Sequence, residues 1–224
     1  MPARYTDDTV RSGLLSRRSF LIGSAAALGA LGQAGCTTGG MTRAEAARVY
    51  GPVPDEQFPI PAVDVKKVDP DYYRRTVRYD TDKAPGTIIV DPGNYFVYRV
   101  EEEGLATRYG ANVGRAGFLW SGDAYVGRKA EWPTWTPPKE MILRQPEAAK
   151  YAGGMPGGLD NPLGARTLYL YQNGAYTLYT IYSTSHPETI GTNLTSGCIG
   201  LLTQDMLHLY SRTPVGTNVV VRPA

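Results

Sequence analysis

Alternating apolar and polar residues predict short strands along most of the chain after residue 85. Period-two patterns rich in β-branched and aromatic residues are typical of strands. They occupy residues 87–90, 95–100, 105–113, 124–128, 167–171, 175–182 and 218–221. In the run 175–182, alternation places Tyr176, Leu178, Thr180 and Tyr182 on one face. Tyr182 is therefore predicted at the end of a strand.

Turn and helix signals punctuate these strands. Asn173-Gly174 predicts a β-hairpin. Asp91-Pro92-Gly93-Asn94 has proline second and glycine third, as in a type II turn. Helical patterns occupy residues 203–212, with Thr203 as N-cap, and 139–151, where Pro146 begins a second short helix. Many short strands with a few short helices predict a mostly β domain, either a sandwich or barrel-like.

Residues 37–84 are rich in proline and charge, which disfavours long helices. Residues 42–50 are predicted to form a short helix, and the rest an extended arm that holds the domain away from a membrane.

Residues 1–36 are interpreted as a targeting segment. Arg17-Arg18 within Ser16–Leu21 is typical of a twin-arginine export signal, and the apolar run 20–31 is too short for a permanent membrane span. Gln33-Ala34-Gly35-Cys36 is similar to a lipoprotein cleavage site, which would make Cys36 a lipid-bearing N-terminus. Cleavage after Ala34 would instead leave Cys36 free. We favour the lipoprotein, located in the periplasm.

Composition narrows the function classes. Lys and Arg total 23 against 21 Asp and Glu, so charge gives no reason to expect nucleic acid as a partner. The 16 tyrosines suit half-exposed sheet faces, or alternatively a glycan groove.

Cys198 is the single cysteine in the body of the chain. Gly197 and Gly200 flank it, and a helix begins a few residues later, an environment that favours the reactive thiolate. Backbone N–H groups near Gly197 and Cys198 are candidates for an oxyanion hole. An inert buried thiol and a disulfide with Cys36 are the alternatives. One cysteine and two histidines do not make a metal-ligand set.

Three segments around this cysteine resemble the catalytic signature of the L,D-transpeptidases, the YkuD-like family. They are residues 181–184, 188–191 and 195–199, and further landmarks lie at 85–90, 132–138 and 161–164. The resemblance covers roughly residues 85–222. It implies a β-sandwich or barrel-like domain and acyl transfer on peptidoglycan stem peptides through a thioester at Cys198, with no cofactor.

The departures from that signature concern the acid–base residues. Tyr182 stands where the family has its general-base histidine, Ser183 replaces the following glycine, Ser196 the second histidine, and Gly200 an arginine. A tyrosine loses its proton only at a pH of about 10, and loss of an acid–base partner costs about 10²–10⁴ in rate.

The remaining candidate residues follow from position. His186, four residues past Tyr182, is an alternative base, whereas His208 is interpreted as a surface or packing residue. Ser183, Thr195 and Trp135 are candidates for substrate binding. Two hypotheses result: a slow L,D-transpeptidase whose acceptor is a stem peptide, an envelope protein or water, or an inactive member that binds stem peptides or an envelope partner.

Overall fold

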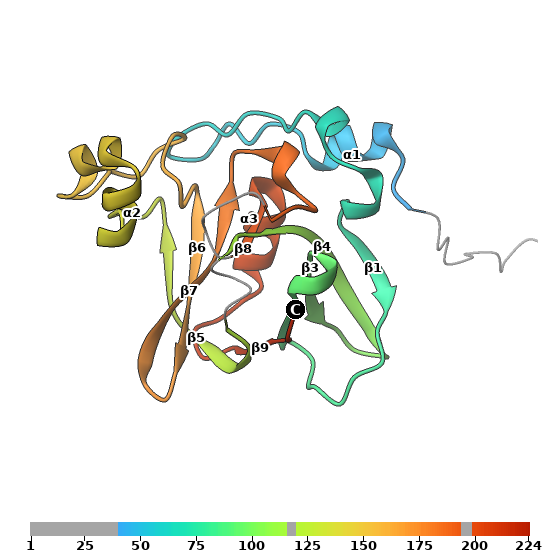
Figure 1. Cartoon of the computed structure of the whole chain (residues 1–224). Helices are drawn as coiled ribbons and strands as arrows, with labels where there is room; N and C mark the ends of the chain where they lie inside the picture. The colour runs from blue at the N-terminus through green and yellow to red at the C-terminus, as the bar shows by residue number, and fades with distance from the viewer. Residues whose placement is uncertain (1–39, 116–119, 194–198) are drawn as a thin grey trace, which may run out of the picture. The chain divides into compact units, whose positions relative to one another are not determined.

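The first half and the second half of one strand pair with different neighbours, and this closes the sheet. The structure is a computed structural model that describes residues 40–115, 120–193 and 199–224, apart from the side chain of Glu140. In it, β4 (Leu105–Val113) pairs with β1 (Arg75–Arg78) through residues 105–108 and with β8 (Ile199–Leu202) through residues 111–113. The sheet order is β1-β4-β3-β2-β9-β5-β6-β7-β8, and the β4–β8 pairing joins eight strands into a barrel-like sheet (Figure 1).

The other strands and helices are short. The remaining strands are β2 (Ile88–Asp91), β3 (Phe96–Val100), β5 (Gly122–Glu131), β6 (Arg166–Gln172), β7 (Ala175–Thr184) and β9 (Asn218–Val221). The helices are α1 (Arg43–Val49), α2 (Lys139–Arg144), α3 (Thr203–Ser211) and the 3₁₀ turns η1 (Val65–Lys67), η2 (Pro70–Tyr72), η3 (Pro92–Asn94), η5 (Pro146–Tyr151) and η6 (Pro187–Thr189). The prediction of a mostly β, barrel-like domain with a few short helices is confirmed.

The core lies between the inward face of the sheet and α3. Ile181 of β7, Ile199 of β8 and Leu168 of β6 are fully buried in one cluster with Met206 and Leu209 of α3. Because side chains alternate along a strand, the neighbours of these residues in β6, β7 and β8 face the other way. That outward face carries the candidate site.

Several predicted elements have the expected bounds. The strand predicted at 105–113 is β4, the Asn173-Gly174 hairpin joins β6 to β7, and Pro146 separates α2 from η5. Asn173 and Gly174 both have positive φ, 52° and 80°, as a two-residue hairpin turn of this kind requires.

The structure differs from the sequence predictions at three points, where local hydrogen bonds or backbone conformation decide the outcome. Residues 91–94 do not form a type II turn: the Asp91 carboxylate accepts from the Asn94 N–H at 3.2 Å and closes η3, and the positive φ falls on Tyr95. Thr203 is not the N-cap of α3; Leu202 is, and the Thr203 hydroxyl donates to the Thr184 carbonyl at 3.3 Å. The alternation in β7 breaks at Leu178, which has φ of 68° where the register with β6 shifts.

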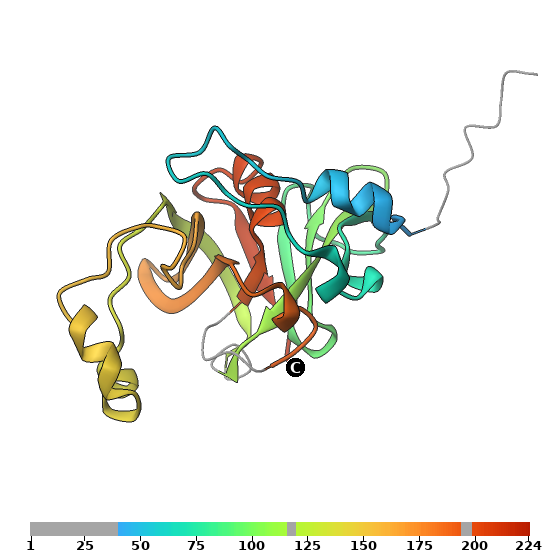
Figure 2. The same ribbon diagram turned by 90° about the horizontal axis from the view of Figure 1, so that it is seen from above.

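The prediction of an extended arm is wrong for residues 42–78. The short helix is present as α1, with Thr42 and Glu45 forming a reciprocal capping box, but the chain after it folds back across one end of the sheet (Figures 1 and 2). Tyr50 and Tyr73 are buried against Leu202 and Ile190, and β1 adds to the sheet. Prolines prevent long helices here, but burial of two large aromatic side chains holds the short turns against the domain.

Candidate active site

Four residues of neighbouring strands lie in one row across the outward face of the sheet. Tyr182 of β7 pairs with Thr167 of β6 on one side and with Gly200 of β8 on the other, and Gly200 pairs in turn with Asn112 of β4. Tyr182 is only 7% exposed. Tyr182, which we predict to stand in the family's general-base position, therefore lies between β6 and β8.

The strand β8 begins immediately after Cys198 in the sequence. Ile199 pairs with Ile181 in the parallel register of β7 and β8. Cys198 itself, together with Thr195, Ser196 and Gly197, lies outside the described residues, and so does Cys36. The roles predicted for these five residues stay predictions.

Asn112 is a site residue that sequence reasoning missed. Its side-chain oxygen accepts from the Gly200 N–H at 3.1 Å, its nitrogen donates to the Thr189 hydroxyl at 2.7 Å, and it is fully buried. A Cβ on Gly200 would lie 2.5 Å from the Asn112 oxygen, so only glycine permits this approach. The sequence feature that could have pointed to Asn112 is that it is the one amide side chain in the otherwise apolar end of the strand predicted at 105–113.

Ser183 is placed differently from its predicted role in substrate binding. It is 1% exposed, and its hydroxyl accepts from the Arg166 N–H at 3.1 Å and donates to the Arg166 carbonyl at 3.3 Å. The side chain shares the inward face with Ile181 because the two are two residues apart in one strand. Ser183 joins β6 to β7, and its hydroxyl is not presented to a ligand.

His186 lies in the loop that follows β7. Its side chain is 70% exposed, and its Nδ1 lies 3.3 Å from a Glu188 carboxylate oxygen. The histidine borders a cavity of about 340 Å³ between the N-terminal segment and the ends of β7 and β8. Residues 60–64, 184–188 and 202–204 form most of the wall.

The tryptophan-bearing block after β5 is held by the neighbouring segments. Trp135 exchanges two backbone hydrogen bonds with Met155, of 2.9 and 2.7 Å. The Trp132 indole N–H donates to the Glu56 carboxylate at 3.0 Å, and its ring packs edge-on against Phe58. Glu56 also accepts from Arg166 at 2.6 Å. Glu56 and Phe58 of the N-terminal segment thus hold Trp132 in place. Trp132 also borders the same cavity as His186.

The described residues contain neither a metal-binding cluster nor a helix that could span a membrane. In that part of the chain, no group of three or more His, Cys, Asp or Glu side chains is arranged to hold a metal ion. No helix within the described ranges has both the length and the apolar character needed to cross a bilayer.

Comparison with known proteins identifies the kind of domain that carries this site. The family model for the L,D-transpeptidase catalytic domain, YkuD, matches residues 85–221, a range that contains strands β2 to β9 and α3. The chain belongs to the L,D-transpeptidase catalytic domain family.

Individual relatives agree over part of their length. The probable L,D-transpeptidase YbiS of Escherichia coli K12 is 36% identical over 95 residues, which are 42% of this chain and 29% of YbiS. The probable L,D-transpeptidase ErfK/SrfK of the same strain is 35% identical over 97 residues, 43% of this chain and 30% of the relative. This chain therefore spans less than a third of the length of these two relatives.

A solved structure from Brucella melitensis is similar in sequence over a longer stretch. It is described as a probable carnitine operon oxidoreductase and is 41% identical, covering 71% of this chain and 99% of that chain with a TM-score of 0.49. The activity in that description belongs to the Brucella protein and is not transferred to this chain.

Proposed function

We propose that this protein is an exported peptidoglycan L,D-transpeptidase of reduced activity, with Cys198 as its nucleophile. The observation that carries the proposal is the family match, combined with the row in which Tyr182 lies beside Gly200, two positions after the cysteine. The family is named for transpeptidation at L,D bonds, and peptidoglycan cross-linking is its general role.

The proposed reaction has two acyl-transfer steps. The Cys198 thiolate attacks the carbonyl carbon of the amide after the third stem-peptide residue, and the C–N bond breaks with release of the terminal D-amino acid, whose amine takes up a proton. The amine of a second stem peptide then attacks the thioester carbonyl, loses a proton, and releases the thiolate. An envelope protein amine or water in place of that amine would give protein attachment or carboxypeptidase activity.

Tyr182 makes the first step slow. At neutral pH an ordinary thiol is a few per cent ionised, so Cys198 is acylated without a base, but no group of suitable acidity stands in the histidine position to protonate the leaving amine. His186 is the proposed substitute. Its exposed imidazole lies 3.3 Å from a Glu188 carboxylate oxygen.

The second candidate function is stem-peptide binding without turnover. Tyr182 in place of the base favours it, and so does the cavity of about 340 Å³ beside the end of β7, which offers a concave site. Either function places the protein in the periplasm, through twin-arginine export and a lipid on Cys36.

One experiment separates the two functions. The full chain is incubated with a carbapenem, and intact mass with peptide mapping follows acylation of Cys198, with Cys198→Ala as the blank. A slow adduct on Cys198 supports the enzyme. If no adduct forms within hours in the wild type while stem peptide still binds, the enzyme proposal is lost and the binding function is supported.

A further inference from the structure

Four tyrosines lie side by side on β5, β6 and β7, next to the row that contains Tyr182. Tyr125 pairs with Tyr171, and Tyr171 pairs with Tyr176, across the three strands. The ring centroids of these two pairs are 6.1 and 5.6 Å apart, and the fourth ring, Tyr169, meets Tyr176 edge-on at 5.6 Å. We call these four residues the tyrosine strip. It leads to the hairpin of β6 and β7, which points away from the N-terminal segment across the other end of the sheet (Figure 1).

Strand alternation places the tyrosine strip on the outward face of the sheet. Leu170 of β6 is fully buried in the core, so its neighbours Tyr169 and Tyr171 point to the other face. Tyr125 and Tyr176 share that face because they pair directly with Tyr171. Tyr176 is 37% exposed, and Tyr125 and Tyr171 are half-buried. The strip therefore lies on the same face as the Tyr182 row and is open to a ligand.

Two successive rows of paired residues follow the Tyr182 row along these strands. They consist of Arg128, Tyr169 and Thr180, and then of Tyr125, Tyr171 and Tyr176. All six side chains carry a hydroxyl or a guanidinium group, and none is aliphatic. Aromatic ring faces with polar tips suit a ligand that itself has apolar ring faces and hydroxyl groups, as a sugar has.

Both strand pairs are bulged at the tyrosine strip. Gly127 is an extra residue of β5, and residues 177–179 of β7 stand opposite Leu170 alone. A Cβ on Gly127 would lie 2.3 Å from the Tyr171 ring, so this ring rests directly on the glycine backbone. Bulges redirect side chains and are frequent beside functional sites. The bulged backbone thus fixes the position of the Tyr171 ring on the sheet surface.

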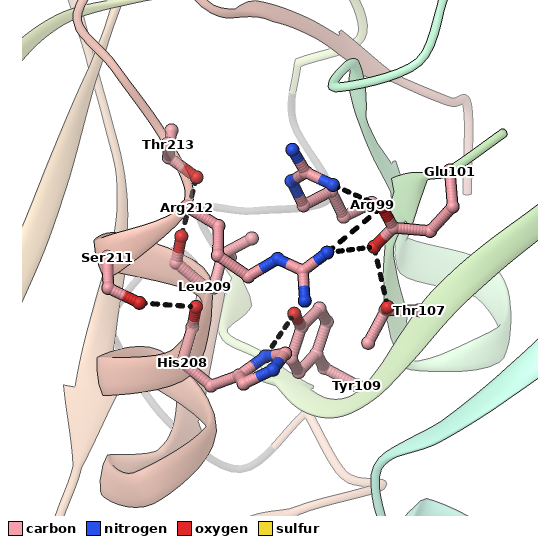
Figure 3. A network of polar contacts seen from close by, with 9 residues as sticks. All are labelled: Arg99, Glu101, Thr107, Tyr109, His208, Leu209, Ser211, Arg212 and Thr213. Carbon is pink, nitrogen blue, oxygen red and sulfur yellow. Dashed lines mark hydrogen bonds and ion pairs between the residues drawn. The ribbon is translucent and has the colours of Figure 1, made fainter.

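Arg128 adds hydrogen-bond donors to this surface. Its exposed side chain places the guanidinium 3.5 Å from the centre of the Tyr169 ring, and among the described residues it has no acidic partner. Arg99 and Arg212 differ, because both bind the Glu101 carboxylate in the cluster beside α3 (Figure 3). Arginine has five N–H donors and no acceptor. Stacked on a ring, Arg128 keeps these donors available to the carbonyl and hydroxyl oxygens of a ligand.

We propose that the tyrosine strip binds the N-acetylated glycan strand of peptidoglycan, with sugar rings stacked on the tyrosines and Arg128 donating to acetamido carbonyl groups. The inference rests on the proposed function, in which the Tyr182 row receives the stem peptide that this strand carries. Three extended residues span about 10 Å. Tyr171 is four residues along β6 from Thr167 of the Tyr182 row, about 13 Å at the rise of a strand. A glycan one stem peptide away from the row therefore reaches the strip.

Binding is measured on the full chain with soluble oligosaccharides. Chitotetraose, a neutral oligomer of N-acetylglucosamine, is titrated by calorimetry, and maltotetraose, which lacks acetamido groups, is the control sugar. We expect saturable binding of chitotetraose and a markedly weaker response to maltotetraose.

The same titration separates this inference from the proposed function. Neither sugar carries a peptide or reacts with a thiol, so Cys198→Ala should bind chitotetraose as the wild type does. If a carbapenem acylates the wild type but chitotetraose does not bind, the glycan site alone is overturned. Chitotetraose binding without acylation would support the glycan site and remove the transpeptidase.

Variants test the assigned residues. Tyr176→Ala is expected to weaken chitotetraose binding about fivefold or more, whereas Tyr176→Phe keeps the ring and should bind nearly as the wild type does. Arg128→Gln should weaken binding and reduce the preference for chitotetraose over maltotetraose. Leu178→Asn is the matched control, since Leu178 is 75% exposed on the same hairpin, lies outside the two rows and has a positive φ of 68°, which asparagine tolerates. Circular dichroism confirms folding, and Arg128→Gln decides the matter if Tyr176→Ala unfolds.

A protein partner is the other occupant that a tyrosine-rich surface fits. Sedimentation velocity tests for a second copy of this chain. Self-association that both Tyr176→Ala and Leu178→Asn abolish would assign the strip to an interface between copies and overturn the proposal. Equal affinity for the two sugars, or equal chitotetraose binding by Tyr176→Ala and Leu178→Asn, would overturn it as well.

Discussion

The hydroxyl of Tyr50 donates to the buried carboxylate of Asp205 at 3.1 Å, across 155 positions of sequence. The same hydroxyl accepts from the Arg74 N–H at 2.7 Å, and the Arg74 guanidinium lies 3.3 Å from Asp205. Residues preceding the family domain are thus joined to α3 by a closed polar network. The N-terminal segment is part of the folded unit for this reason.

Removing that hydroxyl is expected to destabilise the protein. Tyr50→Phe leaves the buried Asp205 carboxyl and the Arg74 N–H each without one partner, at a cost of about 1–3 kcal/mol in the free energy of unfolding. Urea denaturation measures it. Tyr79→Phe is the control, because the Tyr79 hydroxyl is buried without a hydrogen-bond partner and its removal should be neutral or stabilising. Equal losses in both variants would contradict the importance of the Tyr50 network.

Two buried groups make opposite contributions to the pH dependence of stability. Burial raises the pKa of Asp205 from 3.8 to about 7. Between these pH values the folded protein binds more protons at this carboxyl than the unfolded chain does. The contribution of Asp205 to the free energy of unfolding therefore falls as pH rises from about 4 to 7. Burial lowers the pKa of His208 from 6.5 to about 4, so its contribution falls as pH drops through the same interval.

The two contributions should partly cancel in the wild type, and single variants should expose each. In His208→Gln only the Asp205 contribution to the pH dependence remains. The free energy of unfolding of this variant, relative to the wild type, is therefore expected to be higher at pH 5 than at pH 7.5. For Asp205→Asn the free energy of unfolding, relative to the wild type, is expected to be higher at pH 7.5 than at pH 5. Urea unfolding at pH 4.5, 5.5, 6.5 and 7.5 measures both. Parallel pH profiles for wild type and both variants would contradict the assigned shifts.

Gly200 and Asn112 are expected to be energetically coupled. In Gly200→Ala the new Cβ would lie 2.5 Å from the Asn112 side-chain oxygen, and such overpacking costs about 1–3 kcal/mol. Asn112→Ala removes the acceptor of the Gly200 N–H, a buried donor, at a similar cost. The double variant should cost less than the two added together, because alanine at 112 makes room for the methyl group. If the losses in the free energy of unfolding of the two single variants simply add up in the double variant, Gly200 and Asn112 are not coupled.

Tyr182→His should raise the rate of Cys198 acylation by a carbapenem about tenfold or more, since it supplies the missing acid–base group. The single change is preferable to one that also replaces Ser183, whose hydroxyl joins β7 to Arg166 of β6. Stopped-flow absorbance with mass spectrometry follows the adduct. Tyr182→Phe is the control for loss of the phenol alone. An unchanged rate in Tyr182→His would show that further residues of the site have been lost.

Local patterns determined much of the fold and the identity of the family. Alternation located β4 and the hairpin of β6 and β7, since side-chain period and turn chemistry depend on neighbours in the sequence. The motif around Cys198 indicated the family that the match to residues 85–221 established. The replacement of the family's histidine by Tyr182 is likewise a prediction from the sequence motif.

Tertiary structure decided what depends on residues far apart in the chain. The prolines of residues 42–78 predicted an arm, and only the packing of Tyr50 and Tyr73 against Leu202 shows that this segment is part of the domain. Ser183 and Asn112 acquire their roles from Arg166 and Gly200 on adjoining strands, and no local pattern states which strands adjoin.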